Sequence, residues 1–311
     1  MPEENQPQSA PEVSVLIVGY NTKDLLADCL RGLYEYTQGV DFEVLFIDCS
    51  DDGSAKMLAQ DFPQVRVIDN DQNLGFGRGN NALAKHALGQ RLLLLNPDTI
   101  IKDNAIGELC AFADSQPDAG AWGGITVLPN GQIDPGCRQA GPGLAIMVYR
   151  LIGLRARSEA GLTLDDTEPA EVPVLTGAYM MVRRDVWQQL EGFDESFFMY
   201  CEETDLCLRI WRAGYRILMT PKSRITHLVG SGASDSPKRT LAMTKGVMHM
   251  ARKHFGSLHV LAEGLLRWTY SLSRFTAGLL LAPIKPAKAA SMRKKHRVIV
   301  FNPKQWWGGW A

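Results

Sequence analysis

The chain has 311 residues, of which 45% are hydrophobic and 22% charged, so it can form one large or two ordinary globular domains without disulfide staples. Its six cysteines form no C-x-x-C pair and lack zinc-ligand spacing, which excludes a zinc ribbon and favours reduced thiols in the cytoplasm. The net charge is only −1 and no apolar run reaches the ~20 residues of a membrane-spanning helix, so neither nucleic-acid binding nor a transmembrane anchor is expected.

The first elements in chain order predict a parallel α/β sheet. Residues 1–12 are polar, include three prolines and predict a disordered lead-in. Val13–Val18 is a continuous apolar run typical of a buried strand, and an amphipathic helix follows it. Further short apolar strands at Glu43–Ile47, Val65–Ile68 and Arg91–Leu95 alternate with helices, which predicts βαβ units.

Two aspartates follow strands at the edge where such sheets bind ligands. Asp48 ends the second strand and could accept hydrogen bonds from a nucleobase or ribose, or serve only as a turn residue. Asp98 lies just past the fourth strand, two residues after Asn96. A carboxylate there can hold a hard divalent cation such as Mg²⁺ or Mn²⁺, which would also bind a diphosphate. The alternative is that Asp98 caps the helix expected from Lys102.

The glycine-rich segment 73–81 (NLGFGRGNN) precedes a helix expected at Asn80–Leu88. Its backbone N–H groups could face a phosphate, and Arg78 could pair with that phosphate or simply lie on the surface. The segment lacks the third glycine of G-x-G-x-x-G and follows the third strand instead of the first, which disfavours a nicotinamide-dependent enzyme.

The second half of the chain is less regular. Residues 139–170 resemble a variable loop region, and an apolar run at 174–182 predicts a strand. The segment 201–206 (CEETDL) places three acids at the start of a helix, more than capping and the helix dipole require, so one carboxylate could be a general base. His227, expected in a loop after a strand at Tyr215–Met219, could be a metal ligand, a phosphate donor or a structural residue.

Charge is concentrated towards the end of the chain. Residues 258–311 hold nine Lys or Arg and a single acid, Glu263, so this segment carries +8 and residues 1–257 carry −9. Helices are expected at Asp235–Phe255 and Leu258–Leu281. Aromatic and basic residues on an apolar-rich helix fit binding to an anionic membrane surface through residues 258–297. The alternative is packing onto the catalytic domain or a second subunit.

Taken in order, six stretches of the chain resemble the inverting family-2 glycosyltransferases of the GT-A fold, and within that family the rhamnosyltransferase-type members. The stretches are VSVLIVGYN (13–21), FIDCSDDGS (46–54), NLGFGRGNN (73–81), LLLNPDT (93–99), TGAYMMVRRD (176–185) and GFDESFFMYCEETDLCLR (192–209). Six stretches in the right order with sensible spacing are a specific signal, although each alone is weak.

The resemblance implies a fold and a domain division. It implies a GT-A type, Rossmann-like, mostly parallel sheet flanked by helices, with a C-terminal helical extension. The catalytic domain would span 13–255, with a nucleotide-binding half at 13–100 and an acceptor-binding half at 101–255, and a basic, amphipathic helical tail would occupy 256–311.

The resemblance also implies site residues. Asn96-Pro97-Asp98 would replace the family's D-x-D motif, with Asp98 and His227 as ligands of a divalent metal (Mg or Mn). Glu203 stands where the family's general base is commonly Asp, and Glu202 could share that task. The residues expected to bind the nucleotide-sugar are Tyr20, Asn21, Asp48, Gly75, Arg78 and Asn96.

The resulting functional expectation is transfer of a sugar from a nucleotide-sugar donor to an acceptor hydroxyl with inversion, in cell-surface polysaccharide or glycolipid synthesis. L-rhamnose from dTDP-rhamnose is the donor that the rhamnosyltransferase likeness implies. The acceptor would be a saccharide or a lipid-linked saccharide, and a homo-oligomer stays open. We expect the protein in the cytoplasm, with the membrane-binding tail placing it at the inner face of the cell membrane. The alternative is a non-catalytic nucleotide-sugar-binding or scaffold protein of a polysaccharide assembly system.

Overall fold

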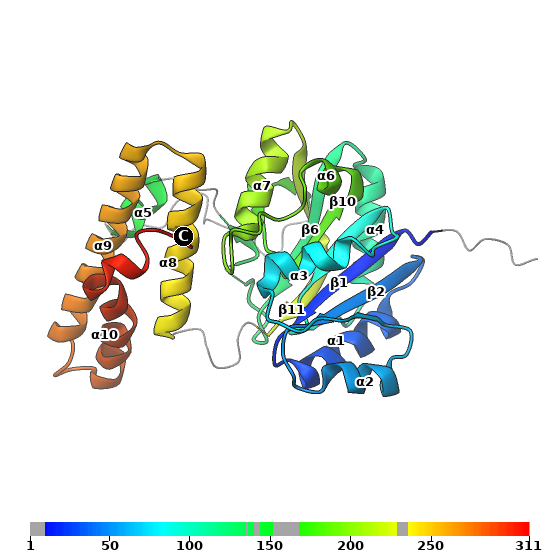
Figure 1. Ribbon diagram of the computed structural model, residues 1–311, viewed down its shortest axis with the longest axis horizontal. Helices are drawn as coiled ribbons and strands as arrows, with labels where there is room; N and C mark the ends of the chain where they lie inside the picture. Colours follow the sequence, from blue (N-terminus) through cyan, green and yellow to red (C-terminus); the bar gives the residue numbers. More distant parts are fainter. Residues whose placement is uncertain (1–9, 135, 140–143, 152–167, 229–235, 311) are drawn as a thin grey trace, which may run out of the picture.

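The computed structural model describes residues 10–134, 136–139, 144–151, 168–228 and 236–310. Most of the expected lead-in at 1–12 therefore lies outside the described residues. In the described part of the chain, one large sheet is covered by helices on both faces, and a further group of helices lies beside it (Figure 1).

The large sheet is mostly parallel. Its strand order is β3-β2-β1-β4-β10-β6-β11-β5, with β8 paired to β11. The strands β10, β5 and β8 run antiparallel to their neighbours, while the other pairs are parallel. A small second sheet pairs β7 with β9. The strands are β1 (Val13–Gly19), β2 (Phe42–Asp48), β3 (Arg66–Ile68), β4 (Arg91–Leu95), β5 (Thr99–Ile100), β6 (Ala119–Val127), β7 (Arg138–Gln139), β8 (Ala170–Glu171), β9 (Val174–Leu175), β10 (Tyr179–Arg183) and β11 (Arg216–His227).

The helices follow the strands closely in the first half of the chain and form a group of their own near its end. They are α1 (Lys23–Tyr36), α2 (Ser54–Asp61), α3 (Gly75–Ala84), α4 (Ala105–Ser115), α5 (Leu144–Leu151), α6 (Arg184–Gln189), α7 (Glu202–Arg212), α8 (Pro237–His254), α9 (Ser257–Leu280), α10 (Pro286–Phe301) and the 3₁₀ turn η2 (Pro303–Gln305).

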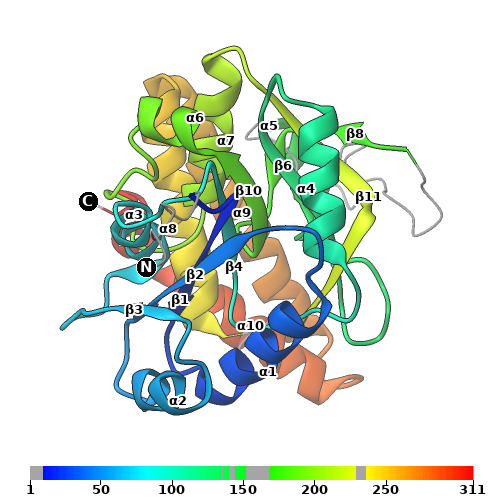
Figure 2. The ribbon, with the colours of Figure 1, turned by 90° about the vertical axis from the view of Figure 1, so that its right-hand side faces the viewer.

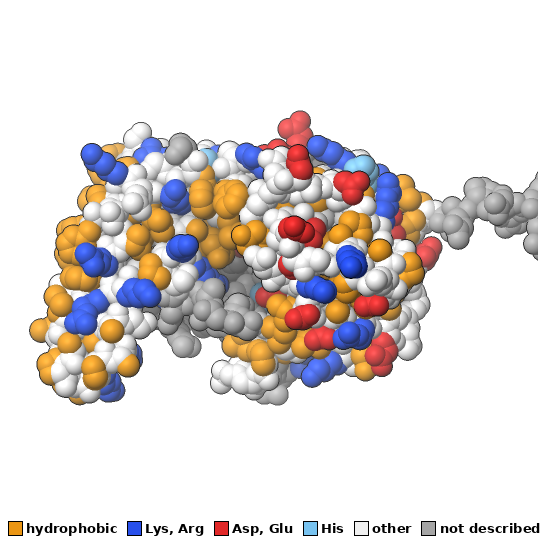
Figure 3. All heavy atoms as spheres, turned by 60° about the horizontal axis from the view of Figure 1, so that its bottom comes forward, with side chains coloured by type: hydrophobic (Ala, Val, Ile, Leu, Met, Phe, Trp, Pro, Cys, Tyr) orange, Lys and Arg blue, Asp and Glu red, His pale blue; other side chains and the backbone are white. Residues whose placement is uncertain are grey.

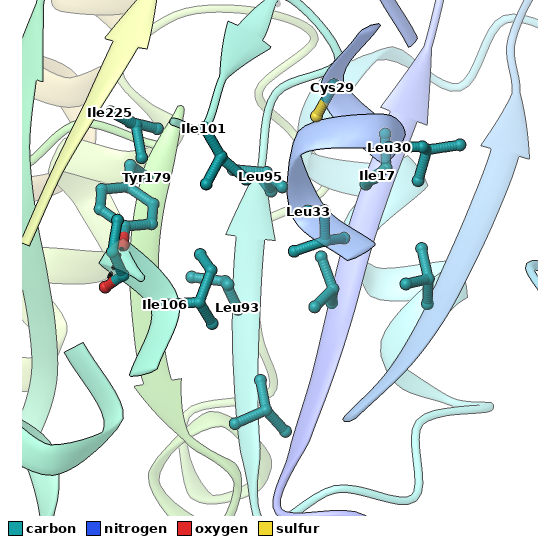
Figure 4. Packing of buried hydrophobic residues seen from close by; sticks show 14 of the residues in the cluster. Ile17, Cys29, Leu30, Leu33, Leu93, Leu95, Ile101, Ile106, Tyr179 and Ile225 are labelled. Atoms are coloured by element: carbon teal, nitrogen blue, oxygen red, sulfur yellow. Dashed lines mark hydrogen bonds between the residues drawn. The ribbon is translucent and has the colours of Figure 1, made fainter. Parts of the chain in front are cut away.

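Successive side chains of the apolar strands point to opposite faces of the sheet and so contribute to two separate hydrophobic cores. In β1, Val13, Val15 and Ile17 join the core under α1, α2 and α4, whereas Leu16 joins the core under α3, α6 and α7. Figure 4 shows Leu30 and Leu33 of α1 over Ile17. A strand that is buried on both faces needs apolar side chains at nearly every position, and the one polar residue of β1, Ser14, is hydrogen-bonded to Glu43 and Gly89. Figure 2 shows the resulting three layers, with α1 and α4 on one side of the sheet and α3 and α6 on the other.

The helices α8, α9 and α10 share a third core. It is built around Met248, Ala251, Val260, Ile299 and Trp306, so it contains residues from both sides of the expected boundary at 255. The domain boundaries themselves remain a prediction. No helix in the described ranges is long and apolar enough to cross a bilayer.

Several local expectations differ from the structure. The helix after the glycine-rich segment begins at Gly75, not Asn80, because Asn73 accepts the N–H of Gly75 and turns the chain into the helix earlier. The run at 174–182 is two strands separated by a turn. The strand at Tyr215–Met219 continues through a bulge as far as His227, so this histidine belongs to a strand and not to a loop. A helix, α5, lies within the region expected to be a loop.

Candidate active site

The carboxyl ends of β1, β2, β4, β6 and β11 meet at one edge of the sheet, because these strands are all parallel to one another. The structure brings most of the predicted site residues to this edge. Tyr20 and Asn21 follow β1, Asp48 ends β2, and Asn96 and Asp98 follow β4. His227 is the last residue of β11 at the same edge.

Hydrogen bonds join the first two of these segments. The backbone N–H of Asn21 donates to Ser50 Oγ at 2.9 Å, and the N–H and hydroxyl of Ser50 both donate to Asp48 Oδ1 at 2.9 Å. Asp52 accepts the N–H groups of Thr22 and Lys23 and so holds the start of α1. A hollow of about 430 Å³ opens beside these groups. It is lined by Asn21, Thr22, Lys23, Asp24, Leu25 and Asp52.

His227 lies between two carboxylates. Its Nε2 is 3.3 Å from Asp98 Oδ1, and its Nδ1 is 3.0 Å from Asp134 Oδ2. The amide Nδ2 of Asn96 is 3.5 Å from the same Nε2. The backbone fixes this arrangement, because His227 pairs with Thr99 across β11 and β5 and the N–H of Leu228 donates to Asp98 O at 2.8 Å.

Asp134 is a site residue that the sequence analysis missed. It is buried just after β6, where its Oδ1 accepts the N–H of Gly136 at 2.8 Å and its N–H donates to Thr126 O. Burial would raise its pKa, but the hydrogen bonds from His227 and Gly136 lower it below its ordinary value. The sequence does contain one signal for Asp134, the turn residues Pro129-Asn130-Gly131. This turn brings the chain back to the end of β6, where Ile133 pairs with Val127 and places Asp134 at the edge of the sheet.

The pair Asp98–His227 fits a divalent cation. Neighbouring ligands of an octahedral ion bound at about 2.1 Å lie roughly 3.0 Å apart, close to the 3.3 Å between these two atoms. Asp134 on the far ring nitrogen supplies the carboxylate–histidine support that metal-binding histidines usually have. Within the described ranges, no three His, Cys, Asp or Glu side chains converge on one metal position. The protein would therefore supply two ligands and leave the others to phosphate oxygens and water, as Mg²⁺ prefers.

The same two carboxylates control the protonation of His227. Burial alone would lower the pKa of His227, but the hydrogen bonds and charges of Asp134 and Asp98 raise it to about 9. At neutral pH the metal-free imidazole is therefore protonated, and an arriving cation must displace that proton.

The two predicted catalytic acids lie in different surroundings. Glu202 is only 4% exposed, and its Oε2 has no hydrogen-bond partner. Burial and the nearby charge of Glu203 raise the pKa of Glu202 well above its ordinary value, which favours the protonated form of its carboxyl. Glu203 is half-buried. Of the pair, Glu203 is the more accessible to solvent.

Glu203 is connected to the Asn96–Asp98 turn through the start of β10. A Cβ added at Gly177 would lie 3.7 Å from the Cβ of Glu203, so the two segments are in close contact. The next residue, Ala178, accepts the N–H of Asn96 at 3.1 Å. The structure thus brings the start of α7 to the same edge as Asp98.

The contacts of Gly75 and Arg78 serve to join α3 to the loop before α7. Gly75 adopts φ +73°, and a Cβ there would lie 2.4 Å from Phe198 O, so only glycine fits. The guanidinium of Arg78 donates to Glu195 O at 2.9 Å. A role for either residue in binding phosphate stays a prediction.

Comparisons with known proteins agree with this architecture. A sequence model described as "Glycosyltransferase like family 2" matches residues 10–271. The chain is 28% identical over 270 residues to an N-acetylglucosaminyl-diphospho-decaprenol L-rhamnosyltransferase of Mycobacterium tuberculosis, covering 80% of this chain and 85% of the relative. It is 24% identical over 239 residues to the rhamnosyltransferase WbbL of Escherichia coli, covering 69% and 83% of the two chains.

Solved structures show the same fold. The mannosyltransferase PcManGT of Pyrobaculum calidifontis, in complex with GDP-Man and Mn²⁺, superposes with a TM-score of 0.61 over 97% of this chain and 89% of its own, at 16% identity. GalNAc-T7, with UDP, GalNAc and Mn²⁺, gives a TM-score of 0.61 over 95% of this chain and 57% of its own, at 17% identity. The expected GT-A fold is confirmed by these likenesses, which are too distant in sequence to show more than the fold.

Proposed function

The chain belongs to glycosyltransferase family 2, and from that membership we propose that it is an inverting, metal-dependent glycosyltransferase with Glu203 as its general base. The observation that carries the proposal is the convergence of Asp48, Asp98, His227 and Glu203 on one edge of the sheet from four separate segments. A nucleotide-sugar would lie across that edge, with its nucleoside near Asp48 and its diphosphate near Asp98.

The metal-binding residues would be Asp98 and His227. A cation held there would offset the charge that develops on the nucleoside diphosphate as it leaves. Asp134 orients His227 for this role, and Asn96 contributes an amide beside the same ring nitrogen. The two solved relatives that contain Mn²⁺ support a divalent ion of this kind.

The transfer would be a single in-line displacement. Glu203 takes the proton of the acceptor hydroxyl. At the same time, the oxygen of that hydroxyl forms the new bond to the anomeric carbon. The bond from that carbon to the diphosphate oxygen breaks on the opposite face, so the anomeric configuration inverts. Glu202 is less suited to this task, because it is buried and its raised pKa favours the protonated carboxyl, so we assign the role of base to Glu203 alone.

The relatives suggest the substrate class. Two are named as rhamnosyltransferases, and the name of the mycobacterial relative places its acceptor on a diphospho-decaprenol lipid. We therefore propose an L-rhamnosyl donor such as dTDP-L-rhamnose and a lipid-linked saccharide acceptor, in polysaccharide or glycolipid synthesis.

The test is turnover with purified protein, a panel of nucleotide-sugars and a lipid-linked N-acetylglucosamine acceptor, with and without Mn²⁺. We expect product of inverted configuration that depends on the metal. The variant Glu203→Gln should lower kcat by about 10²–10⁴ while donor binding is retained, because general-base catalysis usually contributes that much. Glu195→Gln, on the neighbouring loop, is the matched control.

Two outcomes would contradict the proposal. Undiminished turnover in Glu203→Gln would place the base elsewhere. Donor binding without transfer to any acceptor and without donor hydrolysis would favour the alternative, a non-catalytic nucleotide-sugar-binding protein.

A further inference from the structure

The helical hairpin α9–α10 has an unusual charge distribution. From residue 264 to the last residue given, the sequence contains nine Lys or Arg and no Asp or Glu. Over these helices, at the left of Figure 3, basic and hydrophobic side chains are exposed side by side, while the acidic side chains gather over the sheet domain. Such a surface is complementary to an anionic partner.

One face of α9 is an exposed apolar stripe. Leu258, Leu261, Leu265 and Leu279 are all exposed and recur at helical spacing, so they lie on the same side of the helix. Leu272 lies on that side too and is half-buried.

The two arginines of α9 do not belong to this stripe. Arg267 pairs with the buried Glu263, and Arg274 stacks over Tyr270. The sequence pattern interleaved these arginines with the leucines, but the helix turns them to another side.

One face of α10 supplies the positive charge. Arg293, Lys294 and Arg297 line a groove of about 540 Å³ together with Ala290 and the aromatic rings of Phe275 and Phe301. The rings meet edge to face at 5.4 Å, which joins the basic face of α10 to the apolar side of α9. Gly278 permits this close packing, because a Cβ there would lie 2.9 Å from Arg293 Cγ.

The turn between the two helices is also apolar and strongly exposed. Leu280 is 79% exposed and Ile284 74% exposed. Lys285 and Lys288 follow directly and are exposed as well. An apolar tip with flanking lysines is the pattern of a segment that enters the headgroup region of a bilayer while its charges stay at the phosphates.

We propose that this face of the α9–α10 hairpin docks on an anionic phospholipid surface, with Leu280 and Ile284 inserted and Arg293, Lys294 and Arg297 contacting lipid phosphates. Charge decides between this occupant and a second copy of the chain, because two acid-free basic faces would repel each other. Three cations next to two aromatic rings match the interface of a bilayer, where lipid phosphates lie directly above the apolar chains. Docking would bring the catalytic edge near a lipid-linked acceptor, but it does not depend on the reaction being correctly assigned.

The experiment is co-sedimentation of the full chain with phosphatidylcholine vesicles that either contain or lack phosphatidylglycerol. We expect binding only to the anionic vesicles and loss of binding at high salt. The double variant Lys294→Glu/Arg297→Glu should weaken partitioning by about tenfold or more. The control Lys56→Glu/Lys222→Glu makes the same charge change at exposed positions of the sheet domain and should bind normally.

A second variant separates insertion from general electrostatic attraction. Leu280→Ser/Ile284→Ser keeps every charge and should also weaken partitioning several-fold, because it removes the buried apolar area. Competition with inorganic diphosphate distinguishes a lipid surface from a site for free phosphate. Full displacement by diphosphate at low concentration would overturn the proposal.

The remaining outcomes are decisive as well. Equal binding to neutral vesicles, or unchanged binding by both double variants, would refute the proposal. A change in oligomeric size of Leu280→Ser/Ile284→Ser without a change in vesicle binding would identify the face as a contact between chains instead. Thermal melting and turnover with a water-soluble acceptor check that the variants fold, and vesicle binding without any turnover would sink the proposed function while leaving the docking inference intact.

Discussion

At the scale of single residues, His227 lies between Asp98 and Asp134, and we propose that this arrangement prepares it to bind a cation. A histidine that carries a proton on both nitrogens repels a cation, and one whose far nitrogen donates to a carboxylate is oriented to receive it. Asp134 therefore acts through His227 and not on the substrate directly.

We predict that Asp134→Ala lowers the affinity for Mn²⁺ by about 10- to 100-fold, since loss of a supporting carboxylate usually has this effect on a metal-binding histidine. Titration of Mn²⁺ in the presence of a nucleoside diphosphate, followed by electron paramagnetic resonance, measures it. Asp118→Ala, at an exposed position, is the control. An unchanged Mn²⁺ affinity in Asp134→Ala would mean that His227 needs no such orientation.

The buried carboxyl of Glu202 makes a prediction about pH. Its pKa is raised in the folded chain, so between the unfolded pKa near 4.5 and the higher folded pKa the native state binds more protons than the unfolded state. The free energy of unfolding should therefore fall as pH rises through this range, by up to about 1.4 kcal/mol per pH unit.

The variant Glu202→Gln has no carboxyl to titrate at this position, so this slope should become flatter. At pH 8 the variant should therefore be more stable than the parent chain. Chemical denaturation from pH 5 to pH 8 measures the effect, with Glu108→Gln on α4 as the exposed control. A parent slope that matches the slope of Glu202→Gln would show that Glu202 titrates normally.

The sequence could predict the residues whose chemistry is local. Asp48 ends a strand, Asp98 follows one and Glu203 lies in the first turn of a helix, so pattern and resemblance were enough to propose them, and their roles remain predictions. Asp134 was missed because its proposed role depends on contact with His227, which is 93 positions away in the sequence. Only the pairing of β6 with β11 brings the two residues together. The assignments of Gly75 and Arg78 to the donor were read from the same glycine-rich segment, whose contacts in the structure join two elements of the protein.

At the scale of elements, the start of α7 is held in place by the middle of α8. Tyr200 and Cys201 both adopt positive φ angles, which turn the chain sharply into the helix that carries Glu202 and Glu203. Gly246 of α8 packs directly against this turn, since a Cβ there would lie 2.4 Å from Tyr200 O. The position of Glu203, the proposed base, thus depends on a helix outside the sheet.

We predict that Gly246→Ala destabilises the chain by about 1–3 kcal/mol, the usual cost of overpacking, and lowers turnover because α7 is displaced. Gly256→Ala, where a Cβ meets nothing within 4 Å, should change neither. Denaturant titration and initial rates test the pair. Equal stability of the two variants would mean that α8 can shift without moving the turn.

Element types were predictable where periodicity was strong, as in β1, β2, β4, α7, α8 and α9. Element ends were less so. The strand β11 continues past its expected end because β6 and β5 offer it backbone partners, and that information is absent from the local sequence. The start of α3 coincides with a hydrogen bond that the backbone N–H of Gly75 donates to the side chain of Asn73, which the apolar pattern does not reveal.

At the scale of the whole molecule, the sheet domain and the α8–α10 group are joined through buried charge. Asp205 of α7 is fully buried and pairs with Arg209 of the same helix and with Lys253 and His254 of α8. Burial would raise the pKa of Asp205, but the charge of Arg209 and the hydrogen bonds from all three partners lower it below its ordinary value. Removing one partner would leave an unpaired buried charge, so this junction favours a single relative placement of the two groups.

The charge asymmetry of the chain was visible in its composition, but of the two helices that carry it only α9 was predicted with its own range. The face on which that charge gathers was not, because it follows from how α10 packs on α9. Arg267 and Arg274 of α9 are engaged by Glu263 and Tyr270, so the proposed membrane face takes its charge from α10.

The pairing of Thr99 with His227 has one more consequence. Since Asp98 stands directly before β5 and His227 ends β11, which pairs with β5, the two side chains of the proposed metal site cannot move apart without opening the sheet. If a bound cation is removed, these two side chains should therefore stay in place. Rebinding of the cation should then be limited by the loss of water from the ion and of the proton from His227, and not by refolding.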